Sequence, residues 1–133
     1  MNGLTLAYIG DAYYELKIRD YLIITKKLTK VDELHKHAIK FTSAIPQDKI
    51  MNYLLDNDLL FEQEILLYKR GRNASGVGRK NIDNKIYSNA TGFEALIGGL
   101  YIEDITRCNE IINKAIEHIE KGDFNGKSSW ENK

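Results

Sequence analysis

The sequence repeats apolar residues at helical spacing over most of its length, and this pattern constrains the fold more than any other feature. Apolar residues recur every three or four positions, while the alternation typical of a β-strand is scarce. The chain of 133 residues contains one proline, Pro46, so few positions are closed to a helix. The pattern therefore predicts an all-α domain.

We expect about six helices. Their predicted ranges are 4–25, 31–41, 46–55, 61–69, 85–102 and 106–121. The first helix carries apolar residues on two faces, one of them formed by Leu6, Ile9, Tyr13 and Leu16. A helix that is apolar on most sides usually lies in the middle of a bundle. Gly122 is expected to end the sixth helix.

The length suits a single domain. We expect residues 1–122 to form this domain and the polar residues 123–133 to be a mobile tail. The single Cys108 excludes an internal disulfide, so the reducing cytoplasm is the simplest compartment. The sequence contains no secretory signal and no apolar stretch of 18 residues, and we therefore expect no membrane-spanning helix.

Two isolated carboxylates are the most informative polar residues. Asp11 is the only charged residue between positions 1 and 14, and Glu94 is the only one between positions 86 and 102. An ion inside an apolar helix is costly unless it has a partner. That partner is a buried basic residue, backbone hydrogen bonds, or a divalent cation such as Mg²⁺ or Mn²⁺. Glu15, one turn beyond Asp11, can join the same face.

Glycines surround both acids, at positions 10, 92, 98 and 99. A glycine inside a helix costs about 1 kcal/mol relative to alanine. Close approach of two helices, or of a ligand, explains such glycines. Spacing alone leaves two interpretations open, a metal site and a pair of satisfied core acids.

A basic segment, KRGRNASGVGRK, occupies positions 69–80 and contains five basic residues and no acid. The rest of the chain has 14 basic and 19 acidic residues, a net charge of −5. The segment overlaps a predicted loop over positions 71–84, and long loops in compact domains are often functional. Guanidinium groups pair well with phosphates. We predict a phosphate-binding loop, with a solvated surface loop as the alternative. The candidate residues are Arg70, Arg72, Asn73, Arg79 and Lys80.

Two strings resemble signatures of the ribonuclease III family. LAYIGDAYYE at positions 6–15 resembles the signature helix of its endonuclease domain, and FEALIG at positions 93–98 resembles its second catalytic helix. With KRGRNA between them and no double-stranded-RNA-binding domain expected to follow, the chain is similar to the shortened Mini-III branch. The resemblance implies an all-α ribonuclease III-type endonuclease domain that acts as a homodimer. It also implies a Mg²⁺-dependent hydrolase, with Mn²⁺ as a substitute, that cuts double-stranded RNA during maturation of large-subunit ribosomal RNA.

Individual roles follow from the same resemblance. Asp11 matches the signature aspartate and Glu94 the glutamate that binds the essential metal, so both are expected to be catalytic and metal-binding. Tyr8 falls where the family has an aromatic residue at its dimer interface. Arg70 and Arg72 fall in the loop expected to grip the duplex.

The chain departs from the wider family pattern at several positions. Ala7 and Thr91 stand where that family has further acids, which predicts fewer acidic ligands and more water around the metal. Another family acid belongs near the third predicted helix, where either Gln47 or Asp48 can correspond to it. The chain also begins closer to the signature than expected, so we expect a short N-terminal helix to be absent.

Three functions compete at this point. The first is a metal-dependent double-strand ribonuclease. The second is a non-catalytic RNA-binding or ribosome-assembly module, motivated by Ala7 and Thr91. The third is a helical protein-interaction domain in which Asp11 and Glu94 are satisfied core groups.

Overall fold

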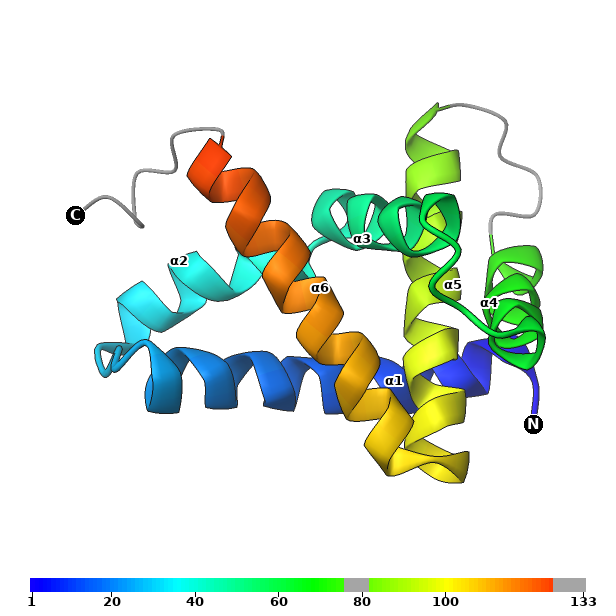
Figure 1. Ribbon diagram of the computed structural model, residues 1–133, viewed down its shortest axis with the longest axis horizontal. Helices are drawn as coiled ribbons and strands as arrows, with labels where there is room; N and C mark the ends of the chain where they lie inside the picture. Colours follow the sequence, from blue (N-terminus) through cyan, green and yellow to red (C-terminus); the bar gives the residue numbers. More distant parts are fainter. Residues whose placement is uncertain (76–81, 126–133) are drawn as a thin grey trace.

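The computed structural model describes residues 1–75 and 82–125, arranged as Figure 1 shows. This part of the chain forms six α-helices and one short π-helix, and contains no strand. The elements are α1 (Gly3–Asp20), η1 (Tyr21–Thr25), α2 (Val31–Thr42), α3 (Ala44–Asp56), α4 (Glu62–Ala74), α5 (Ile82–Glu103) and α6 (Ile105–Asn125). The prediction of an all-α domain with about six helices is confirmed for these residues.

Helix α5 is central to the fold and contacts α1, α3, α4 and α6 (Figure 1). Its Phe93, Leu96 and Ile97 are fully buried, as are Tyr14 and Ile18 of α1. Each such side chain contributes roughly 1.5–3 kcal/mol through its removal from water. Contact on several sides explains why the sequence of α5 is apolar around most of its circumference.

The first helical segment ends differently from the prediction. Helix α1 stops at Asp20, and the next five residues form the π-helical turn η1, in which the Lys26 N–H donates to the Tyr21 carbonyl at 3.1 Å. Lys27 then takes a φ of 61°, which ends the helical path. Leu16 belongs to one of the two apolar faces of a helix expected in the middle of the bundle, yet it is 53% exposed, so the expected burial is wrong at this position.

The predicted loop over positions 71–84 is shorter in the structure, because α4 continues to Ala74 and α5 begins at Ile82. Gly71 does not break α4. It lies buried against α5, where an added Cβ would be 2.5 Å from the Ala95 Cβ and 2.8 Å from the Thr91 carbonyl oxygen. The glycine therefore allows two helices to pack closely, which a local sequence pattern cannot distinguish from a break.

The sixth helix does not stop at Gly122, and α6 runs on to Asn125. An exposed glycine costs a helix only about 1 kcal/mol relative to alanine, which is too little to end α6 here. Residues 126–133 of the predicted tail lie outside the described residues. None of the described helices combines the length and hydropathy that a membrane span requires.

Candidate active site

The candidate site lies where α1 crosses α5, and two glycines create the crossing. A Cβ added to Gly10 would lie 1.8 Å from the Glu94 carbonyl oxygen, and one added to Gly98 would lie 1.9 Å from the Leu6 carbonyl oxygen. Any side chain at these positions would push the two backbones apart. The close-approach explanation of the glycines is correct, and it brings the helix positions of Asp11 and Glu94 together.

Asp11 and Glu94 meet at this crossing. Asp11 is exposed, whereas Glu94 is partly buried. Burial makes the largest contribution to raising the pKa of the Glu94 carboxyl, and a hydrogen bond with the Asp11 side chain and the negative charge of Asp11 act in the same direction, so that the pKa reaches about 8. The Gln47 side chain opposes the shift, and the charge of Glu15 adds to it. The site therefore gathers negative charge that a cation would neutralise.

Gln47 is the residue that sequence reasoning could not place. It is 2% exposed on α3, near enough to Glu94 to affect its pKa, and its Nε2 makes no hydrogen bond of ordinary geometry to a described residue. The neighbouring Asp48 faces elsewhere and accepts a hydrogen bond from Asn89 Nδ2 at 2.8 Å. Of the two candidates on α3, Gln47 is the one at the carboxylates. The sequence left Gln47 and Asp48 as alternatives and could not choose between them.

The polar atoms at the site fit a hydrated divalent cation. Among the described residues, no group of three or more His, Cys, Asp or Glu side chains is arranged to hold a metal ion. Asp11 and Glu94 nevertheless supply two carboxylates, and Mg²⁺ commonly binds through one or two carboxylates while keeping several waters. One carboxylate oxygen of Glu15 is also buried without a hydrogen bond to the described chain, so it is available as a hydrogen-bond acceptor for water bound to the cation.

The two family acid positions that this chain lacks contribute no metal ligand. Ala7 is buried and packs with Leu6 and Ala95. Thr91 is also buried, and its hydroxyl donates to the Tyr87 carbonyl oxygen of its own helix at 3.0 Å. Water would therefore complete the coordination of an ion on this side of the site.

The predicted RNA-binding residues separate into three groups. Arg70 and Arg72 lie on helix α4 rather than in a loop, two positions apart and so on different sides. Arg70 donates to the Met1 carbonyl oxygen at 3.2 Å, whereas the Arg72 guanidinium lies 5.3 Å from the centroid of the Tyr68 ring. Asn73 is exposed beside Arg72. Arg79 and Lys80 lie outside the described residues.

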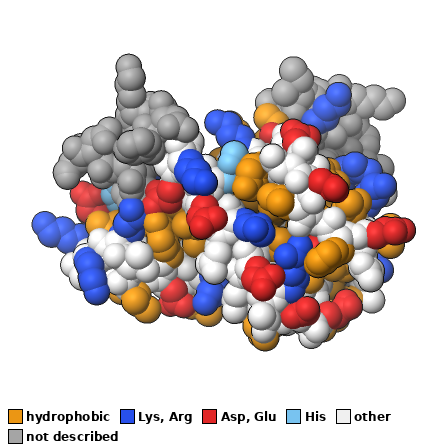
Figure 2. Space-filling model, viewed as in Figure 1, with side chains coloured by type: hydrophobic (Ala, Val, Ile, Leu, Met, Phe, Trp, Pro, Cys, Tyr) orange, Lys and Arg blue, Asp and Glu red, His pale blue; other side chains and the backbone are white. Residues whose placement is uncertain are grey.

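Tyr8 lies in an exposed apolar stripe on α1. Its side chain is 83% exposed, and Leu4, Ala12 and Leu16 follow the same spacing of four residues. Leu4 and Leu16 are each 53% exposed. An apolar helix stripe of this kind is typical of a protein interface. On the face drawn in Figure 2, by contrast, acidic and basic side chains are interspersed.

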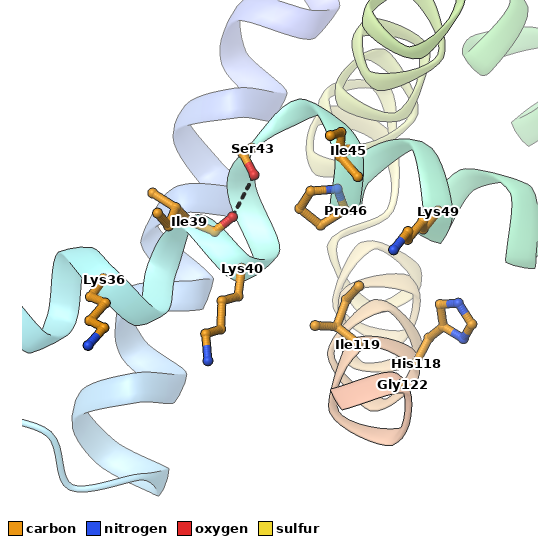
Figure 3. Close-up of a pocket in the computed structure, with 10 residues that line it drawn as sticks. All are labelled: Lys36, Ile39, Lys40, Ser43, Ile45, Pro46, Lys49, His118, Ile119 and Gly122. Carbon is orange, nitrogen blue, oxygen red and sulfur yellow. Dashed lines mark hydrogen bonds between the residues drawn. The ribbon is translucent and has the colours of Figure 1, made fainter. Parts of the chain in front are cut away.

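A surface pocket lies away from the carboxylates, between α2, the start of α3 and the end of α6 (Figure 3). Its volume is about 570 Å³, and its lining includes Lys36, Lys40 and Lys49 as well as Ile39 and Ile45. It contains no carboxylate among its described lining residues. This surface pocket is distinct from the candidate active site, because none of its lining residues belongs to the α1–α5 crossing.

Comparison with known proteins gives a consistent result. Residues 4–104 match the Ribonuclease III domain family. The chain is 50% identical to a Mini-ribonuclease 3 of Acholeplasma laidlawii over 126 residues, which cover 95% of this chain and all of that protein. It is 45% identical to the Mini-ribonuclease 3 of Enterococcus faecalis, over 90% of this chain and 91% of the relative. A crystal structure of a Fusobacterium nucleatum protein superposes with a TM-score of 0.74 at 29% identity, covering 89% of this chain and 93% of that one.

Proposed function

The chain belongs to the ribonuclease III domain family and is a ribonuclease, and from this premise we propose that it is a Mg²⁺-dependent endonuclease for double-stranded RNA. We further propose that it acts as a homodimer in the cytoplasm, on precursors of large-subunit ribosomal RNA. The observation that carries the proposal is the pairing of Asp11 with Glu94 at the glycine crossing of α1 and α5. Mn²⁺ is the expected substitute for Mg²⁺.

The proposed chemistry assigns one task to each side chain at the crossing. Asp11 and Glu94 bind the cation as carboxylates, which requires Glu94 to lose its proton. Mg²⁺ held there supplies a Lewis acid that lowers the pKa of water and stabilises charge on a phosphodiester. The Gln47 side chain lowers the pKa of Glu94 and so favours the ionised carboxylate that binds the cation. The expected products carry 5′-phosphate and 3′-hydroxyl ends.

The proposed RNA contacts come from Arg70, Arg72 and Asn73 at the end of α4, together with Arg79 and Lys80. Cationic side chains that bind phosphates displace counterions, so affinity falls with salt. Arg72→Ala should weaken duplex binding and reduce the slope of log Kd against log salt. An unchanged slope would count against a phosphate contact by Arg72.

Cleavage of a duplex RNA tests the central proposal. We expect cleavage with Mg²⁺ and its loss both with EDTA and in Asp11→Asn. Asp32→Asn is the matched control, because Asp32 is an exposed acid on α2, and it should cleave like the wild type. Cleavage that survives EDTA or Asp11→Asn would contradict the proposal. RNA binding by a folded dimer without any cleavage would instead favour a non-catalytic RNA-binding or ribosome-assembly module.

The dimer is proposed to use the α1 stripe around Tyr8. Tyr8→Asp puts a charge in the middle of that apolar surface and should shift the protein towards monomer in sedimentation velocity. Leu66→Asp is the control, since Leu66 is 56% exposed on α4, outside the stripe. Equal effects of the two substitutions, or none from Tyr8→Asp, would place the interface elsewhere.

A further inference from the structure

A polar pocket lies beside the candidate active site, between α3, the end of α4 and the start of α5. Its volume is about 610 Å³. The described residues that line it are four asparagines, two serines, one aspartate, one arginine and one lysine. None of these lining residues is apolar, so the pocket suits a ligand rich in hydroxyl and phosphate oxygens rather than an apolar side chain.

A hydrogen-bonded network fixes one wall of the pocket. Asn89 of α5 is 8% exposed, and its Oδ1 accepts from the Tyr68 hydroxyl. Its Nδ2 donates to Asp48 Oδ1 at 2.8 Å and to Asn52 Oδ1 at 3.1 Å, both on α3. These contacts connect three helices and hold Asp48 and Asn52 in place without help from a ligand.

Donors remain available next to this wall. The Nδ2 of Asn52 and the hydroxyl of Ser88 make no hydrogen bond to another residue in the ranges 1–75 and 82–125, although Asn52 accepts one from Asn89. Amide and hydroxyl groups of this kind both donate and accept. They match a sugar hydroxyl, which is itself a donor and an acceptor.

Positive charge is concentrated at the α4–α5 side of the same pocket. The Arg72 guanidinium lies 5.3 Å from the centroid of the Tyr68 ring, and Tyr68 is part of the Asn89 network. Lys85 is exposed at the start of α5. Cations beside uncharged donors form the pattern expected for a ribose and its phosphate.

The pocket is close to the carboxylates that we propose to cut RNA. Asn89 precedes Glu94 by five residues on α5, about 7.5 Å along the helix axis at 1.5 Å per residue. Asp48 follows Gln47 on α3. Five residues also turn the helix by about 140°, so a nucleotide in the pocket would lie on another side of α5, about one and a half turns from Glu94.

We propose that this pocket binds one ribose and its phosphate near the cut and recognises the ribose 2′-hydroxyl, which makes it a source of preference for RNA over DNA. The proposal rests on the proposed function, since it takes duplex RNA as the ligand. The 2′-hydroxyl is the group by which a protein distinguishes RNA from DNA at a given site. Asn52 and Ser88 are assigned its recognition, and Arg72 and Lys85 the phosphate.

A scan of single 2′-deoxy substitutions tests the proposal. Fluorescence anisotropy, with Ca²⁺ in place of Mg²⁺, would give the Kd of duplexes that carry one deoxynucleotide at each position around the cut. Loss of one hydrogen bond predicts an affinity about three to ten times weaker at one position. In the Asn52→Ala/Ser88→Ala double variant, that penalty should vanish while other positions keep theirs. Asn113→Ala, an exposed asparagine of α6, is the control and should keep the full penalty.

The outcomes separate this proposal from the proposed function. If the double variant is folded and keeps the wild-type penalty at every position, the 2′-hydroxyl assignment is overturned. Duplex RNA that is bound but never cut contradicts the catalytic proposal, while the binding scan still decides the role of the pocket. Wild-type protein that binds no duplex RNA overturns both. Circular dichroism of each variant confirms that it is folded.

Discussion

Replacing Glu94 with glutamine should stabilise the metal-free protein at neutral pH. The pKa of Glu94 is raised from 4.5 to about 8, first by burial and then by Asp11. The folded state therefore holds this proton more tightly than the unfolded state does. The stabilising contribution is fully present below about pH 4.5 and is lost as the pH rises through about 8. Glu94→Gln removes the titration and, with it, this loss.

The pKa values set an upper limit on the effect. With a pKa of 4.5 in the unfolded chain and about 8 in the folded chain, ionisation of Glu94 lowers the free energy of unfolding of the wild type by about 4 kcal/mol at about pH 7.5, relative to low pH. We expect the gain in Glu94→Gln to be smaller, about 1–3 kcal/mol. The reason is that the exposed Asp11 can move away from an ionised Glu94 and relieve part of the repulsion.

Urea unfolding in EDTA, at about pH 5 and about pH 7.5, measures the gain at a fixed protein concentration. Glu103→Gln is the control, because Glu103 is exposed on the same helix, and it should follow the wild type. Mg²⁺ at 100 times its Kd should then stabilise the wild type by about 2.7 kcal/mol and the Glu94→Gln variant much less. A variant that keeps the wild-type pH dependence, or that is less stable at neutral pH, would refute this account of Glu94.

Three further predictions concern the scaffold. Gly98→Ala should lower the free energy of unfolding by about 3 kcal/mol or more, because its Cβ would lie 1.9 Å from a backbone oxygen of α1. Gly122→Ala should raise the free energy of unfolding by about 0.5–1 kcal/mol, because nothing lies within 4 Å of its Cβ. Urea unfolding of the two variants compares these effects. Burial raises the pKa of the Cys108 thiol to about 12, so a disulfide reagent should modify it far more slowly at neutral pH than in denaturant, and equal rates would contradict the burial. Arg107→Ala should cost about 3–5 kcal/mol, since it leaves the buried carboxylate of Glu64, now bonded at 2.7 and 2.9 Å, without its cation; a loss below about 1 kcal/mol in urea unfolding would refute this.

The helices were predictable where their apolar pattern was long and regular. The class, the number of helices and the central part of each one follow from this periodicity. Besides the end of the first helix and the exposed Leu16, the errors lie at two glycines. Gly71 was taken as a break and Gly122 as a stop, whereas both lie inside helices. One is packed against α5 and the other is exposed, and the local sequence around each does not reveal which environment it has.

The candidate site was predictable in part. Asp11 and Glu94 could be identified because an acid in an apolar helix is costly and therefore needs an explanation. Gln47 could be named only as an alternative to Asp48, and Asn89 could not be identified, because amide side chains carry no charge and occur commonly on helix surfaces. Their burial beside other polar groups depends on how α3 and α5 pack.

The sequence by itself determined the all-α class and the two acids that stand out in it, because periodicity and the cost of a buried charge are properties of single helices. Only the tertiary structure decided which polar groups meet. Gly10 and Gly98 bring the backbones of α1 and α5 into contact, which places Glu94 beside Asp11, and the packing of α3 against α5 brings Gln47 to the same carboxylate. Residues separated by most of the chain become neighbours through helix packing, and no local pattern contains that information.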